Sequence, residues 1–130
     1  MEILIFFLLL AFFFWSIFWF ILLIRKSKFP EDRKNFFLKK INDVKKNNDF
    51  EKKILNYDKI LDQILREKKY PWTLWEKLKR NPNIFLDINT LWFAHKIRNK
   101  IAHDVYPNIS EKDYIKSEKV FQKEIRHLLK

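Results

Sequence analysis

Histidine, arginine and asparagine side chains gather in one short part of this sequence, residues 91–103. It contains His95, Arg98, Asn99 and His103. An imidazole titrates near neutral pH, so it can both accept and donate a proton. A guanidinium binds phosphate through forked, charge-assisted hydrogen bonds and stabilises charge that develops on it. The segment therefore carries groups suited to phosphate binding and proton transfer.

The composition excludes most other kinds of active site. The 130 residues include no glycine and no cysteine. Walker A loops, dinucleotide fingerprints and nucleophile elbows need glycine, and disulfides, thiolate zinc sites and iron–sulfur clusters need cysteine. His95 and His103 are eight residues apart, about 12 Å along a helix, which is too far for both to bind one metal ion directly. We therefore expect neither a metal site nor a cofactor.

A helix over about 87–103 would position these side chains. At 100° per residue, Phe93, Ile97 and Ile101 share one face, which we expect to face the core. The four polar side chains lie on the opposite side. Trp92 falls among them, and an apolar residue at that place indicates that this side meets another helix or a partner subunit.

The rest of the sequence predicts a small all-α protein. Apolar residues recur at three- and four-residue spacing, no useful stretch alternates with a period of two, and breaks rich in asparagine and proline separate the segments. Asp49, Thr73 and Ser110 are suited to cap helices. Besides the helix above, we expect helices over about 30–46, 50–69, 73–78 and 110–128, forming an up-and-down bundle within residues 33–130.

Residues 1–24 have a different character. From Ile3 to Ile24 only Ser16 is polar, and the run is 22 residues long. As a helix it would span about 33 Å, against a hydrocarbon core of roughly 30 Å. Glu2 is the only charge before it, and no small-residue cleavage site follows. These features favour a retained transmembrane helix over a signal peptide.

The net charge of +11 is unevenly distributed, because all 27 basic residues follow the apolar run. Residues 25–32 form a basic juxtamembrane segment in which Arg25, Lys26 and Lys28 are expected to contact anionic lipid headgroups. The positive-inside rule then predicts a single-pass protein of the cell membrane, with its N-terminus outside and its C-terminal domain cytoplasmic. The positive balance favours nucleic acid or anionic lipid as a partner, and it also fits a lysine-rich chain whose excess lysine is only solvated surface.

The sequence RNKIAH at 98–103 matches the R-x4–6-H motif and resembles the motif helix of the HEPN superfamily, whose members are small helical bundles. Residues 57–62 resemble the second long helix of such domains, and residues 74–79 resemble their short connecting helix. The resemblance covers about residues 33–129. It implies a HEPN-like fold behind the predicted membrane helix.

The resemblance also implies an activity, metal-independent cleavage of RNA by a homodimer that pairs through the motif helix. Arg98 would bind the phosphate, His103 would act as general acid and base, and Asn99 would position the RNA or His103. His103 follows Arg98 by five residues, which places the two about 140° apart on a helix, so one motif does not easily hold one phosphate from both sides. A dimer, or a helix that ends near His103, would relieve this difficulty. Further residues expected at the RNA or at the interface are His95, Trp92, Lys96 and Lys100.

Other interpretations of these residues stay open. The domain could be a non-catalytic HEPN-like module that binds RNA, a nucleotide or a protein partner, or a structural membrane protein whose basic domain lies on anionic lipid. Arg98 could pair with a carboxylate of a neighbouring helix, Asp58 or Asp62. His103 could hydrogen-bond within the bundle, and His95 could be a packing residue.

Overall fold

The computed structural model describes residues 2–27, 29–70, 72–80 and 82–130, and their side chains except at 2–4, 22–27 and 75. Within these ranges the chain is helical and contains no strand, so the predicted all-α class is confirmed. The elements are α1 (Glu2–Ser27), α2 (Glu31–Lys45), α3 (Phe50–Glu67), α4 (Leu74–Arg80), the 3-10 turn η1 (Pro82–Ile84), α5 (Ile88–His103) and α6 (Glu111–Leu128).

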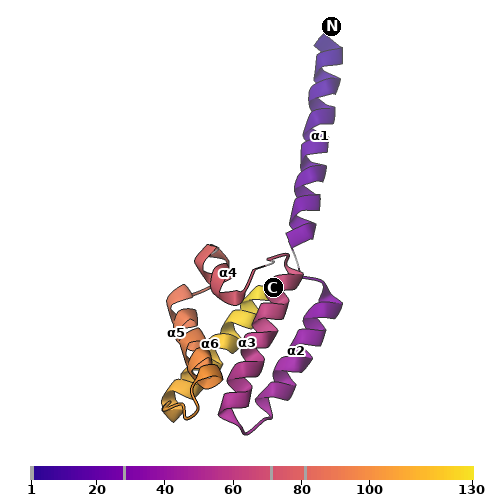
Figure 1. Ribbon diagram of the computed structural model, residues 1–130. Coiled ribbons are helices and arrows are strands. Elements are labelled where there is room, and N and C mark those ends of the chain that lie inside the picture. Colours follow the sequence, from indigo (N-terminus) through magenta and orange to yellow (C-terminus); the bar gives the residue numbers. More distant parts are fainter. Residues whose placement is uncertain (1, 28, 71, 81) are drawn as a thin grey trace.

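Helix α1 stands apart from the other helices and projects from them as a single rod (Figure 1). Its described side chains, from Ile5 to Ile21, are all exposed. The core of the bundle is therefore built without them.

The predicted membrane span over residues 3–24 is wrong. In the part of the chain that the structure describes, no helix has both the length and the apolarity needed to cross a membrane. The predicted single-pass location at the cell membrane is overturned with it. The side chains of Arg25 and Lys26, and the whole of Lys28, lie outside the described residues.

Helices α2 to α6 form a bundle around α3. Helix α3 packs against α2, α5 and α6, and α5 also packs against α6, while α4 crosses one end (Figure 1). Each long helix contributes an apolar stripe at three- and four-residue spacing, as expected for amphipathic helices. Fully buried members of this core include Phe37, Ile41, Tyr57, Leu61, Leu91, Phe121 and Ile125.

The breaks between helices lie where the sequence predicts them. The Asp49 carboxylate accepts the backbone N–H of Lys52 at 3.1 Å, and the Ser110 hydroxyl accepts that of Asp113 at 3.1 Å. Thr73 and Glu76 bond reciprocally at the start of α4. These side chains satisfy donors that the first turn of a helix leaves free, which confirms the predicted caps.

Helix α3 ends at Glu67, and two residues further on Lys69 has left-handed backbone geometry, with φ 66°. Glycine is the usual residue there, because a Cβ atom is strained in that conformation. The Lys69 N–H donates to the Arg66 carbonyl at 2.9 Å, and the Tyr70 N–H donates to the Leu65 carbonyl at 3.0 Å. In a chain without glycine, lysine occupies this position, and the turn leads the chain from α3 towards α4.

Candidate functional site

Helix α5 carries the predicted site residues, and three features fix its position. Asp87 caps its N-terminus by accepting the backbone N–H groups of Asn89 at 3.0 Å and Thr90 at 3.2 Å. Leu91 and Ala94 are fully buried. Because α5 packs against both α3 and α6, two of its faces are covered.

The face of α5 that is buried differs in part from the predicted one. Ile97 is buried as expected, but Phe93 and Ile101 are only half-buried, whereas His95 is 6% exposed. The buried face is centred on Leu91 and Ala94, because α3 covers the side on which the sequence places the polar groups. The position of Trp92 did indicate a neighbour on that side, and the interpretation of His95 as a packing residue is confirmed.

Asp58 of α3 joins the polar side chains of α5 into one cluster. Its Oδ2 accepts the Nε–H of Arg98 at 2.9 Å, and its Oδ1 lies 3.4 Å from the Nδ1 of His95. The Nη1 of Arg98 donates to the side-chain oxygen of Asn99 at 3.1 Å. The alternative in which Arg98 pairs with Asp58 is therefore confirmed.

The burial of these groups explains why they are paired. The side chains of Asp58 and His95 are each 8% exposed, whereas that of Arg98 is 28% exposed. A buried carboxylate is costly unless it is hydrogen-bonded and its charge is balanced. Arg98 supplies the opposite charge from the edge of the bundle. Its guanidinium is thereby held in one place while part of it still faces solvent.

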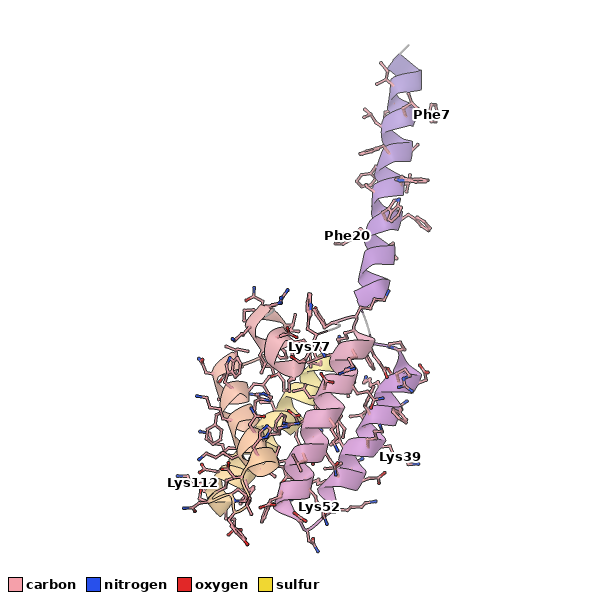
Figure 2. All side chains as sticks on the ribbon, viewed as in Figure 1. Phe7, Phe20, Lys39, Lys52, Lys77 and Lys112 are labelled. Atoms are coloured by element: carbon pink, nitrogen blue, oxygen red, sulfur yellow. The ribbon has the colours of Figure 1, made fainter. Side chains whose placement is uncertain are left out.

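A second carboxylate is neutralised one helical turn away on α3. Asp62 accepts the Nε–H of Arg66 at 2.8 Å and the ammonium of Lys77 at 2.8 Å. Lys77 belongs to α4 and its side chain is fully buried, and Figure 2 shows it where α4 meets α3. The ion pair therefore ties α4 to α3 beside the Asp58 cluster.

These groups line an open pocket of about 400 Å³ between α3, α5 and the start of α4. Its two carboxylates are both ion-paired, so the charges that remain for a ligand are positive. A phosphate-bearing molecule suits this balance, since both guanidinium groups can donate to its oxygens. The lining residues are Asp58, Lys59, Asp62, Arg66, Thr73, Leu74, His95, Arg98 and Asn99.

The other predicted site residues lie elsewhere on α5. His103 is its last residue, is exposed, and does not line the pocket. Among the described residues no side chain hydrogen-bonds to its imidazole. Lys96 and Lys100 are exposed, and the ring of Trp92 meets that of His95 edge-on with centroids 6.1 Å apart. One chain thus brings together His95, Arg98 and Asn99 but leaves His103 outside.

The pocket residues that sequence reasoning missed are Lys59 and Arg66 of α3, and Thr73, which directly precedes α4. A signal was available for their neighbour Asp58, which lies four residues after Ile54 and three before Leu61 on the apolar stripe of α3. A carboxylate in that position has to find a buried partner. Over the described residues, no group of three or more acidic, histidine or cysteine side chains is arranged to hold a metal ion.

Comparisons of this chain with protein-family models, with curated proteins and with solved structures return no match.

Proposed function

We propose that this chain is a HEPN-like, metal-independent endoribonuclease that works as a pair of chains. The observation that carries the proposal is the position of Arg98, whose guanidinium is held by buried Asp58 at the edge of a pocket lined by three cationic and two anionic side chains. A preorganised guanidinium binds a phosphate and stabilises charge that develops on it without reorganising during the reaction. Asn99, bonded to the same guanidinium, supports its orientation.

The chemistry needs one further group, which His103 supplies. The imidazole accepts the proton of the RNA 2′-hydroxyl as the 2′-oxygen bonds to the adjacent phosphorus. The bond from phosphorus to the 5′-oxygen breaks, and that oxygen takes up a proton from water, while the imidazolium returns to solvent the proton that it accepted. The products are a 2′,3′-cyclic phosphate and a free 5′-hydroxyl. Arg98 stabilises the negative charge on the phosphate oxygens throughout.

Two copies of the chain account for the separation of these residues. His103 is exposed at the end of α5 and lies outside the pocket that Arg98 lines. Because the two residues are about 140° apart around the helix, one copy does not direct both at the same phosphate. In a two-fold pair, His103 of one chain approaches the pocket of the other, which produces two equivalent sites.

The test is cleavage of labelled RNA by the full chain in EDTA, with a fused solubility partner because α1 exposes many apolar side chains. Wild type should cut, and Arg98→Ala and His103→Ala should each abolish cutting. Arg126→Ala and His127→Ala on α6 are matched controls and should retain cutting.

When the two inactive variants are mixed in equal amounts, about a quarter of the wild-type rate should return, since each mixed pair holds one intact site. If either variant alone cuts as fast as wild type, the proposal is wrong.

A non-catalytic role in phosphate binding is the second candidate, favoured by the position of His103 outside the pocket. In that case wild type retains RNA in EDTA without cutting it. Arg98→Ala then weakens retention, whereas His103→Ala leaves it unchanged. If wild type neither cuts nor retains RNA at low salt, where phosphate contacts are strongest, both candidates fail.

A further inference from the structure

Four lysines form a stripe along the outer face of α6. Lys112, Lys116, Lys119 and Lys123 are all exposed. Their spacing of four, three and four residues places them within about 60° on one side of the helix. The stripe is about 16 Å long. Within the described part of the chain, no carboxylate forms a salt bridge with any of them.

The stripe borders a groove of about 420 Å³ between α6 and the start of α5, which is also lined by Leu86, Thr90, Ile115 and Val120. Two carboxylates also line the groove, but both already accept hydrogen bonds from backbone N–H groups. Asp87 caps α5. Glu124 is buried and accepts the backbone N–H of Leu86 at 3.1 and 3.2 Å, one contact for each oxygen. The groove therefore offers a ligand positive charge along its edge and apolar surface beneath.

An aromatic surface continues this groove across α5. The ammonium of Lys116 lies 4.3 Å from the centre of the Phe93 ring. Phe93, Asn89, Trp92 and Lys96 line a further hollow of about 470 Å³. The ring of Trp92 in turn contacts that of His95, which belongs to the Asp58 cluster. Lysines and aromatic rings thus follow one another from α6 to the candidate site.

We propose that single-stranded RNA binds along this basic–aromatic track, defined as the lysine stripe of α6 together with Phe93, Trp92 and Lys96. The phosphates lie along the lysines, and bases stack on the exposed parts of the two aromatic rings. The direction of the track rests on the proposed function, because it leads the strand to the pocket of Arg98. Binding itself depends only on the track.

The chemistry of the track selects this partner over two others. An acidic peptide would satisfy the lysines but would not use the aromatic rings as stacking surfaces. A duplex would present phosphates, but its bases are already stacked on one another. A single strand offers both a charged backbone and free base faces, which is the combination that lysines interleaved with aromatic side chains bind.

The test measures binding of a fluorescein-labelled 2′-O-methyl oligoribonucleotide to the full chain by anisotropy. This RNA has no 2′-hydroxyl, so a failure of the cleavage mechanism does not affect the result. Lys116→Glu/Lys119→Glu should raise the Kd about tenfold at 50 mM salt and lower the salt slope by about 1.4, for two lost phosphate contacts. Lys112→Glu/Lys119→Glu should do the same without disturbing Phe93. The matched control, Lys39→Glu/Lys45→Glu, changes the charge equally on α2, and Lys39 lies on the opposite side of the bundle from Lys112 (Figure 2).

The aromatic part of the track has its own signature. Trp92→Ala should raise the Kd about tenfold while the salt slope stays as in wild type, because stacking releases no counterions. The proposal is overturned if the α2 variant loses as much affinity as the α6 variants, or if the α6 variants bind as wild type does. It is also overturned if polyglutamate of equal charge binds as tightly as the RNA, which would assign the groove to an acidic protein. Circular dichroism confirms that each variant is folded.

Discussion

The ion pair between Asp58 and Arg98 should be a major contributor to stability, and a double-mutant cycle measures it. The three variants are Asp58→Ala, Arg98→Ala and the double substitution. In wild type the carboxylate is buried and bonded to Arg98 Nε at 2.9 Å, with His95 as its other neighbour at 3.4 Å. Each single substitution therefore leaves one charge without its partner.

The magnitudes follow from burial. Arg98→Ala leaves a buried carboxylate facing only His95. We expect it to lower the free energy of unfolding by about 3 kcal/mol, the lower end of the range for breaking a buried ion pair, because the lost guanidinium was partly exposed. Asp58→Ala leaves a cation that solvent can reach, so the loss is about 2 kcal/mol, typical of a hydrogen bond to a charged group. With both charges removed, the loss should again be about 3 kcal/mol. The coupling energy between the two residues is then about 2 kcal/mol.

Urea unfolding of the full chain, followed by circular dichroism, gives these free energies if the slope of each transition is unchanged. Asp62→Ala combined with Arg98→Ala is a suitable control, because Asp62 bonds to Arg66 and Lys77 instead. That pair should show little coupling. A coupling energy below about 0.5 kcal/mol between Asp58 and Arg98 would refute the reasoning, because it is the value expected of independent sites.

Two further predictions concern stability. Burial raises the pKa of Glu124, the bond from the Leu86 N–H opposing this in part. The folded state therefore holds this proton more tightly than the unfolded state, so its contribution to stability is complete below the ordinary pKa and is lost as pH rises through the folded pKa. Glu124→Gln should gain stability relative to wild type as pH rises from acid to neutral, and parallel pH profiles in urea unfolding would contradict this. Lys69→Gly should raise the free energy of unfolding by about 1 kcal/mol, because it removes the strain of a side chain at φ 66°. A loss of stability in the same assay would show that the turn is unstrained.

Most of the bundle could be predicted because its helix limits depend on local signals. Asp49, Thr73 and Ser110 bond to backbone groups only a few residues away, so the sequence around each contains all the information that the cap needs. The apolar stripes are local in the same sense. Helix limits predicted from such signals agree with the structure to within a few residues.

The orientation of α5 could not be predicted in the same way. Periodicity identifies one apolar face, but α5 packs against two neighbours, and the second face carries His95 and Arg98. Those groups lie against α3 because Asp58, some forty residues earlier in the chain, supplies their partner. Long-range pairing of polar groups leaves no mark in the local pattern. The transmembrane prediction for α1 was wrong for a different reason. A run of apolar residues does not by itself establish that a helix crosses a membrane.

The structural and the functional interpretation of Arg98 are compatible, although the sequence presents them as alternatives. A guanidinium carries five N–H donors. In the described structure one of them, on Nε, bonds to Asp58, and one on Nη1 bonds to Asn99. The remaining donors belong to a side chain that lines an open pocket and is 28% exposed. The ion pair therefore fixes the direction of the guanidinium without using all of its hydrogen-bonding capacity, so the contact that stabilises the bundle is compatible with the proposed binding of a phosphate by Arg98.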